Sequence, residues 1–431
     1  TTPAAVVAAL GQASATERLD SEQYLSKHFP TLHQLGITPD TADAAPAIYA
    51  ALNTYGGVTP NAGTFNVSNL VIPARTSFIG AGRGRVIIKQ IAGATGAAVA
   101  TEGDRTTNCT ISGFTIDGNK ANQTSANDGL VIDNSASGAQ HLAADGVFGK
   151  QDPRSSVRDI NIFNCKGSGM VQRGKGAHAF SRIWAMSCEG HGFELLGFDN
   201  TYDQLDSGEI GKSGFYLGPG FANNRMSNIK AWYTGMSDFS TYGQGIFADG
   251  SFRNNISNVE IQNAKCPQAL YSKGNSLNNW SNIIIEGPSP GPSAPDFDGI
   301  VLEDCIYSNF FGVTITDRGS APYTLNRAIV ISKSAGGTGT TGIVLYAHVI
   351  NAKGGVAQSL GGNSLAAGNL IVINGTIWLN KTMGIGYVQE MDLGGMRTAA
   401  SDASAAALSP PIPVGSSYIN STTGALTRRL A

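Results

Sequence analysis

The sequence predicts an all-β chain folded as a right-handed parallel β-helix, a solenoid of short strands. Between about residues 106 and 332 an apolar-x-apolar phrase recurs, followed by a gap and then by Gly-apolar-x-apolar. The second half of the phrase begins at Phe193, Phe215 and Ile246, for example, which are 22 and 31 residues apart. Short alternating strands at such a period predict stacked coils, because one coil cannot bury its apolar face alone.

Each predicted strand carries apolar residues at its outer positions, as residues 114–116 and 160–162 do. Alternation turns these outer residues inward and the middle residue outward. A third predicted strand precedes the first phrase in several coils, and Asn228, Asn258 and Asn282 follow it at one place. Since Asn tolerates the left-handed conformation, we expect a bend here, with stacked amides hydrogen-bonded along the column.

Composition fits a large, turn-rich β-solenoid. The chain has 431 residues, of which 41% are hydrophobic, 14% are charged and 55 are Gly, and its net charge is −2. The absence of a basic block argues against nucleic acid as a partner, and no apolar run reaches the ~18 residues needed for membrane insertion. The five Cys are expected to be core thiols, and no Cys/His spacing fits a metal site. We therefore expect no metal and no cofactor.

Four segments are expected along the chain. Residues 1–35 predict an N-terminal helical neck, and residues 36–60 a capping α-helix with the turn that leads into the first strand. This helix should run from about 41 to 54, with Asp40 or Thr41 as N-cap and Gly56-Gly57 at its end. It could cover the open first coil. Residues 61–394 predict the β-helix, and residues 395–431 a C-terminal linker with a short strand at 417–419.

One segment near the start resembles the opening of the pectate-lyase-like β-helices of bacteriophage tailspikes. In that family an Asp-Thr turn (here Asp40-Thr41) starts a helix, a Gly-Gly pair (Gly56-Gly57) leads to a first strand, and an apolar-Gly-x-Gly motif (residues 79–82) closes the first coil. The family's usual Gly-Asp-Gly before the Asp-Thr is absent. The resemblance covers about 50 residues well, residues 36–82, and the rest in architecture alone.

The resemblance implies a homotrimeric depolymerase that binds and cleaves a bacterial surface polysaccharide, namely an O-antigen, capsule or exopolysaccharide. It implies a virion tail protein that is assembled in the host cytoplasm, acts extracellularly, and is joined to the phage tail or baseplate through an N-terminal part outside this sequence. It assigns no catalytic residue, because members of this family place their carboxylates differently.

Carboxylates gather at outward positions of the middle coils. Asp206 and Glu260 lie two coils apart. At ~4.8 Å per coil their backbones would be about 9–10 Å apart, near the ~6.5–9.5 Å carboxyl separation of an inverting glycosidase. Lys230 between them would keep one carboxylate ionised, and Glu194 and Asp203 are the third and fourth catalytic candidates. The alternative is a surface ladder of alternating charges.

Aromatic residues at or beside the same coils are candidates for sugar binding, because ring faces stack on sugar faces. The substrate-binding candidates are Trp184, Tyr216, Lys230, Trp232, Tyr233, Phe247 and Tyr271. The competing interpretation is a packed stack that a neighbouring subunit covers. Four insertions, at 117–128, 233–244, 286–298 and 316–327, fall on one edge and could form a groove wall.

Three functions are compatible with this pattern. Endo-acting glycoside hydrolysis by a carboxylate acid and base is the first. The second is a lyase that performs β-elimination on a polymer containing uronic acid, with Lys230, Arg225 or Arg253 as the cationic neutraliser. The third is a polysaccharide-binding adhesin or tail fibre without catalytic activity. The products separate them, because only a lyase leaves an unsaturated uronate that absorbs near-ultraviolet light.

Overall fold

A computed structural model describes residues 29–102, 108–135, 154–237, 241–287, 296–316, 324–350, 357–359, 369–374, 376–378, 398–399, 417–420 and 426–428. The chain divides into two compact units. The first comprises Thr1–Tyr216 and Gly220–Met226, and the second Leu217–Pro219 and Ser227–Ala431. Each unit contains two sheets of parallel strands, which confirms the predicted parallel β-helix. Sheet I holds the strands of the first half of the repeated phrase, and sheet II those of the second half.

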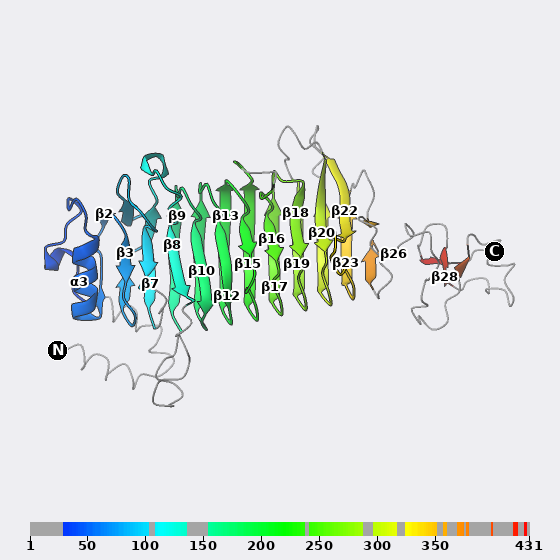
Figure 1. Ribbon diagram of the computed structural model, residues 1–431, viewed down its shortest axis with the longest axis horizontal. Helices are drawn as coiled ribbons and strands as arrows, with labels where there is room; N and C mark the ends of the chain where they lie inside the picture. Colours follow the sequence, from blue (N-terminus) through cyan, green and yellow to red (C-terminus); the bar gives the residue numbers. More distant parts are fainter. Residues whose placement is uncertain are drawn as a thin grey trace, which may run out of the picture. The chain divides into compact units, whose positions relative to one another are not determined.

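The first unit stacks its strands as successive rungs (Figure 1). Its sheet I has the order β1-β4-β7-β9-β11-β13, with β2 paired to β5 and β5 to β7. These strands are β1 (Gly57–Val58), β2 (Gly63–Val67), β4 (Ser77–Ile79), β5 (Val86–Gln90), β7 (Thr110–Asp117), β9 (Ser156–Phe163), β11 (Ala179–Met186) and β13 (Thr201–Ile210). Its sheet II comprises β3 (Leu70–Ile72), β6 (Val99–Thr101), β8 (Leu130–Asn134), β10 (Met170–Lys175) and β12 (Phe193–Phe198).

The second unit repeats this plan. Its sheet I comprises β15 (Arg225–Thr234), β17 (Asn255–Gln262), β19 (Asn279–Glu286), β21 (Asn309–Thr316), β23 (Val344–Ile350), β25 (Leu370–Ile373) and, antiparallel to β25, β26 (Thr376–Trp378). Its sheet II comprises β16 (Ile246–Asp249), β18 (Gln268–Lys273), β20 (Asp296–Glu303), β22 (Thr324–Ser332) and β24 (Ala357–Ser359). β14 (Phe215–Leu217) contributes residues to both units, and so does β15, whose Arg225 and Met226 belong to the first unit.

A small sheet near the C-terminus comprises β27 (Thr398–Ala399), β28 (Ser417–Asn420) and β29 (Leu426–Arg428). β28 confirms the strand predicted at 417–419.

The core of each unit consists of aromatic and aliphatic side chains stacked in register. In the first unit the rings of Phe193 and Phe215 stack at 4.9 Å, and in the second Trp280 stacks on Phe310 at 5.8 Å. All four side chains are fully buried. Since parallel pairing places equivalent positions above one another, the apolar residue of one coil packs on that of the next. The five Cys are free and buried, as predicted.

The predicted third strand is not a separate element, and the prediction was wrong on this point. In β13, β15, β17 and β19 the two predicted strands join through one residue in the left-handed conformation. That residue is Asn258 in β17, with φ 54°. Asn258 Nδ2 donates to Asn228 Oδ1 at 3.0 Å, and Asn282 Nδ2 donates to Asn258 Oδ1 at 3.1 Å. The column of stacked amides is thus confirmed, and it bends sheet I along a line.

Replacing Asn258 with Ala is expected to lower the free energy of unfolding by about 1–2 kcal/mol, the usual cost of a left-handed conformation for a residue with a Cβ and no local hydrogen bond. Asn258→Gly is the matched control, because it loses the same amide hydrogen bonds but keeps the conformation without strain. Urea denaturation of both variants measures the difference. Equal losses for Ala and Gly would contradict the role given to the left-handed backbone.

The N-terminal helix α3 runs from Ala45 to Tyr55, so the predicted start near residue 41 was wrong. Pro lies in its first turn, and its N-cap is Ala44, without a side-chain cap. Asp43 Oδ1 instead accepts the N–H groups of Ala45 at 3.1 Å and Ser68 at 3.0 Å, which fixes the turn before the helix. The helix ends at Gly56, left-handed at φ 68°, as predicted. α3 packs on β1 and β3 (Figure 1).

The expected helical neck lies mostly outside the described residues, which begin at 29. Within its last part, His33–Leu35 form a short 3-10 helix, η1.

Candidate functional site

Glu260, on β17 of the second unit, is held by two donors. Lys230 Nζ lies 3.0 Å from its Oε1, and Gln262 Nε2 donates to the same oxygen at 2.5 Å. Gln262 also donates to Glu286 Oε2 at 2.9 Å. The predicted proximity of Lys230 and Glu260 is therefore confirmed. A carboxylate so engaged suits the role of base or charge stabiliser better than that of proton donor.

Asp206, on β13 of the first unit, lies beside an exposed Trp. In the strand register Asp206 is opposite Trp184 on β11, and Trp184 is opposite Asn161 on β9. The Arg83 guanidinium lies over the Trp184 ring at 5.1 Å, and Arg83 Nη1 is 3.4 Å from Asn161 Oδ1. Trp184 remains 43% exposed, so it can meet a ligand. Asp206 and Glu260 belong to different units, and their predicted separation stays a prediction.

Asp203 lies in a network of charged side chains on the same face of β13 as Asp206. Arg182 makes a bidentate ion pair with Asp159, in which both N–O distances are 2.7 Å. The hydrogen bond to Asp159, together with the charges of Asp159 and Asp203, raises the pKa of Arg182. Asp203 thus contributes negative charge beside a guanidinium that is already paired.

The predicted ring stack in the second unit exists, but one of its members is covered. The rings of Phe247 on β16 and Tyr271 on β18 stack with their centroids 5.0 Å apart. The Tyr242 ring contacts Phe247 in a tilted arrangement, with centroids 6.0 Å apart. Phe247 is only 7% exposed between these two neighbours, which favours the interpretation of a packed stack for this ring. Burial and the charge of Glu303 raise the pKa of Tyr271.

A second aromatic pair lies on β15. Trp232 and Tyr233 meet edge to face at 5.7 Å, and Tyr233 is 43% exposed. Tyr233 is therefore open to a ligand in this unit.

Three polar residues form a column at the start of sheet II in the first unit. Asp128, Ser168 and His191 each lie two residues before a strand, namely β8, β10 and β12. Ser168 joins two carboxyl groups: its N–H donates to Asp128 Oδ1 at 2.8 Å, and its hydroxyl donates to Glu194 Oε2 at 3.1 Å. The structure therefore brings the predicted candidate Glu194 together with Asp128, which sequence reasoning missed.

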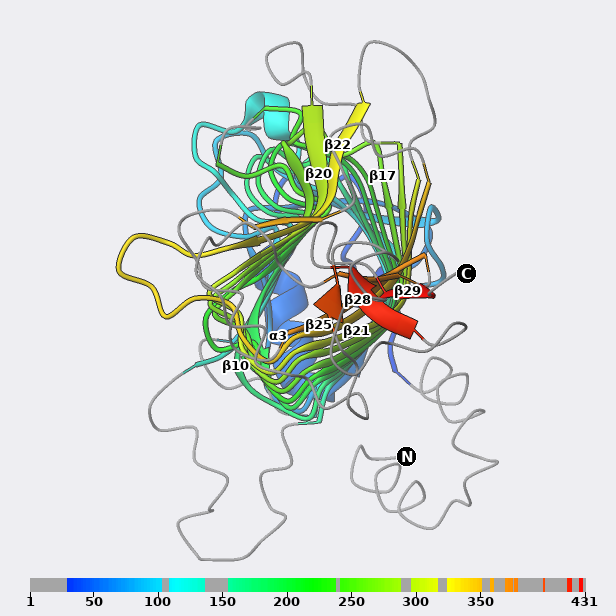
Figure 2. The same ribbon diagram turned by 90° about the vertical axis from the view of Figure 1, so that its right-hand side faces the viewer.

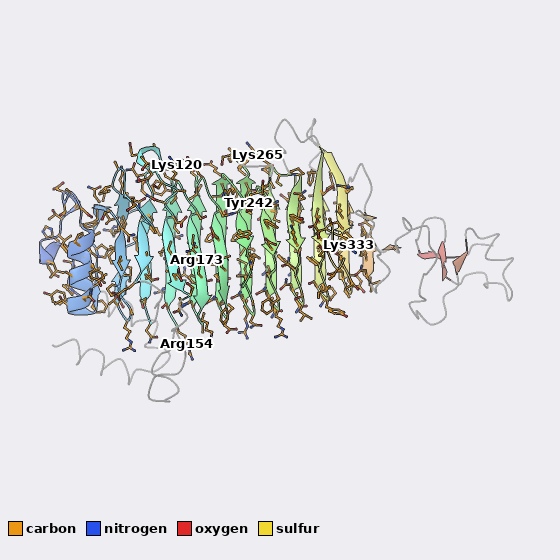
Figure 3. The ribbon with its side chains drawn as sticks, viewed as in Figure 1. Lys120, Arg154, Arg173, Tyr242, Lys265 and Lys333 are labelled. Atoms are coloured by element: carbon orange, nitrogen blue, oxygen red, sulfur yellow. The ribbon has the colours of Figure 1, made fainter. Side chains whose placement is uncertain are left out.

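An arginine and two rings complete this group. Arg173 lies 4.0 Å from Glu194 Oε1 and 3.8 Å from Asp133 Oδ2, and Figure 3 places it on the strands of the first unit. The His191 ring stacks on Tyr216 at 4.9 Å, and the His191 N–H donates to Ser168 Oγ at 3.2 Å. The predicted sugar-binding residue Tyr216 thus joins Glu194 through His191 and Ser168. We call Asp128, Ser168, Arg173, His191, Glu194 and Tyr216 the sheet II cluster.

The two carboxyl groups of the sheet II cluster have contrasting surroundings. Burial raises the pKa of Asp128, and the charge of Glu194 adds to the rise, while the Ser168 N–H and Arg173 act in the opposite direction. Glu194 Oε1 lies 4.0 Å from Arg173, and Glu194 Oε2 accepts the Ser168 hydroxyl. Neighbouring carboxyl groups with environments this different are typical of acid and base pairs in active sites.

Because the pKa of Asp128 is raised in the folded state, the stability of the protein should depend on pH. Because the folded state holds this proton more tightly than the unfolded chain, its stabilising contribution is complete below the unfolded pKa of about 4 and is lost as the pH rises through the folded pKa. The variant Asp128→Asn cannot ionise and keeps an acceptor for Ser168. Its Tm relative to wild type should therefore increase between pH 4 and pH 7 in matched melting curves. A constant difference in Tm would contradict the shift.

The β7–β8 loop stands directly before Asp128. It contains η2 (Lys120–Asn122) and projects beyond the strand ends (Figures 1 and 2). Lys166 Nζ donates to Gln123 O at 2.7 Å, and Asn127 Nδ2 donates to Ala94 O at 2.7 Å, so the loop is tied to the body of the first unit. It can serve as the predicted groove wall beside Asp128. Residues 288–295 and 317–323 of the later insertions lie outside the described residues.

Within the described part of the chain, no group of three or more His, Cys, Asp or Glu side chains could hold a metal ion. No helix there is long and apolar enough to cross a membrane.

Solved structures with a similar fold include an enzyme of polysaccharide chemistry and phage tailspikes. The A-module of a mannuronan C-5 epimerase from Azotobacter vinelandii matches at TM-score 0.56 and 17% identity, over 78% of this chain and 99% of that one. Tailspike protein 2 of the Escherichia coli O157:H7 bacteriophage CAB120 matches at TM-score 0.65 and 15% identity, over 86% of this chain. The gp42 tailspike of an Acinetobacter phage matches at TM-score 0.51 and 14% identity, over 87% of this chain and 68% of that one.

The chain has the parallel β-helix fold of these tailspikes. It spans 48% of the length of the full tailspike protein 2. No protein-family model and no curated protein matches the sequence.

Proposed function

We propose that this chain is part of a phage tailspike that binds a bacterial surface polysaccharide and cleaves it internally by glycoside hydrolysis. The observation that carries the proposal is the pairing of carboxylates with accessible rings on the outer face of the solenoid. Trp184 lies opposite Asp206 in the strand register, and the His191–Tyr216 stack is joined to Glu194 through Ser168. Rings offer a surface for the apolar face of a sugar, and carboxylates bind hydroxyl groups and transfer protons.

The fold is consistent with this activity. Tailspikes share it, and so does an enzyme named for its action on mannuronan. The proposal includes a homotrimeric assembly, attachment to the phage tail or baseplate, and action on the outside of the host cell.

Hydrolysis needs one protonated acid at the leaving oxygen and one ionised carboxylate for water or for the sugar carbon. Glu260, held by Lys230, fits the ionised role in the second unit, and Asp206 beside Trp184 stays a candidate in the first unit. In the sheet II cluster of the first unit, burial raises the pKa of Asp128.

The proposal is tested by incubating the protein with purified surface polysaccharides from a panel of Gram-negative bacteria. Chain length is followed by size exclusion together with near-ultraviolet absorbance. Shortening without new absorbance is the expected result. Shortening with absorbance would replace hydrolysis by β-elimination, with Lys230, Arg225 or Arg253 as neutraliser candidates. Binding without shortening on any polymer would replace the enzyme by an adhesin.

A further inference from the structure

We propose that Asp128 and Glu194 form the catalytic acid and its partner carboxylate, in a saccharide-cleaving site built on the sheet II cluster of the first unit. This inference rests on the proposed function and moves its chemistry away from the pair Asp206 and Glu260. In this site Ser168 holds both carboxyl groups and Arg173 balances charge. The half-buried ring of Tyr216, stacked on the buried His191, supplies a surface for a sugar ring.

The geometry fixes both carboxyl groups relative to one another. Ser168 is 4% exposed, and it uses its N–H for Asp128 at 2.8 Å and its hydroxyl for Glu194 at 3.1 Å. The register of β8, β10 and β12 sets this arrangement, because β10 pairs with both neighbours in parallel. A carboxyl group held on rigid strands by a buried residue is preorganised for proton transfer.

The backbone makes room for Asp128 at one glycine. A Cβ placed on Gly167 would clash with Asp128 Oδ1 and would lie 2.8 Å from the Ala126 carbonyl oxygen. No residue larger than Gly can therefore occupy position 167 without displacing the carboxyl group or the loop before it. Gly167 thus tests the position of Asp128 without touching its chemistry.

The charges divide the two roles. Burial and the charge of Glu194 favour the protonated form of Asp128. Arg173, 4.0 Å from Glu194 Oε1, balances the negative charge on that side. A proton donor and an ionised carboxylate in one cluster are the pair that glycoside hydrolysis requires.

The step balances without any other reactant than water. Asp128 gives its proton to the glycosidic oxygen as the bond from that oxygen to the anomeric carbon breaks. Glu194 accepts a proton from the water whose oxygen forms the new bond to that carbon. Transfer of this proton through solvent restores Asp128, so each cut consumes one water molecule.

The decisive experiment compares four near-isosteric variants on the polymer that wild type cleaves in the panel. Asp128→Asn and Glu194→Gln are expected to lower the rate of new reducing ends by about 100-fold or more, and to bind intact polymer within a few-fold of wild type by calorimetry. Gly167→Ala should also slow cleavage. Asp206→Asn and Glu260→Gln complete the four variants and test the alternative site residues on sheet I. Glu209→Gln is the inert control and should keep the rate, because Glu209 on β13 accepts a hydrogen bond from Ser187 outside the sheet II cluster.

The outcomes separate the two proposals. Wild-type rates in Asp128→Asn or Glu194→Gln, with folding intact by circular dichroism, would overturn this assignment and leave the polysaccharide hydrolase standing. Loss of cleavage in Asp206→Asn and Glu260→Gln alone would return the site to sheet I. Failure of the wild type to shorten any polymer would remove the proposed function and this site with it.

Discussion

Combining Asp128→Asn with Glu194→Gln is expected to slow cleavage no further than the more harmful single change. The cleavage rate of each single variant should fall by about 100-fold or more, because each lacks either the proton donor or the proton acceptor of the same reaction step. Once the acid is gone, the partner carboxylate has no departing sugar to assist. Independent losses would instead multiply to about 10,000-fold. Initial rates of reducing-end formation for the two single variants and the double variant measure the coupling.

The control is a double variant in which the second change lies on sheet I. Asp128→Asn combined with Glu209→Gln should behave as Asp128→Asn alone, because Glu209 on β13 binds Ser187 and has no part in the proposed step. A multiplicative loss in the Asp128 and Glu194 double variant would show that the two carboxyl groups act separately. That result would contradict a shared site.

Replacing Arg327 with Met is expected to lower the free energy of unfolding by about 3–5 kcal/mol, the usual cost of leaving one partner of a buried ion pair alone. Arg327 on β22 binds Asp298 on β20 through two bonds, Nε to Oδ1 at 2.7 Å and Nη2 to Oδ2 at 2.6 Å. Asp298 is only 6% exposed, so water cannot replace the guanidinium. Urea denaturation measures the loss.

A double variant shows whether the loss of stability comes from the unpaired charge of Asp298 or from the lost packing of the Arg327 side chain. Arg327→Met combined with Asp298→Leu removes both charges and should recover most of the stability that the single change loses. Equal destabilisation in the single and double variants would mean that packing of the Arg side chain, rather than its charge, decides the effect.

The fold was predictable because its signal is repeated in every coil. Any one short strand such as β12 or β14 could be assigned wrongly, but the recurrence of the same phrase every 22 to 31 residues predicts stacked coils. The stacked Asn column was also visible, because the same residue recurs at one position of the period. The start of α3 could not be predicted, because Asp40, Thr41 and Asp43 are all good N-cap residues. Pro46 in the first turn and the hydrogen bond from Ser68 to Asp43 determine where the helix begins.

The candidate site was only partly predictable. Outward strand positions identified Glu194, Tyr216 and Trp184, because alternation fixes where they point. Asp128 was missed, since it lies in a turn before a strand, and its partners Ser168 and Glu194 reach it only through stacking. Ser168 is 40 residues from Asp128 and 26 from Glu194 along the chain. A search of the position two residues before each second strand would have found Asp128, Ser168 and His191 together.

Burial of outward residues was the other limit. Phe247 points away from the core by the strand pattern, yet Tyr242 in the preceding loop lies on it. The sequence pattern gives the face of a sheet on which a side chain lies, but not what a loop of unequal length places over it.

Cleavage in water enriched in heavy oxygen tests the central claim of polysaccharide hydrolysis most directly. Products of the polymer that the protein shortens are analysed by mass spectrometry. Hydrolysis predicts one heavy oxygen at each newly formed reducing end, and almost none formed by Asp128→Asn in the same time. Products that carry no heavy oxygen but have lost the elements of water would show elimination, and would contradict the hydrolytic account.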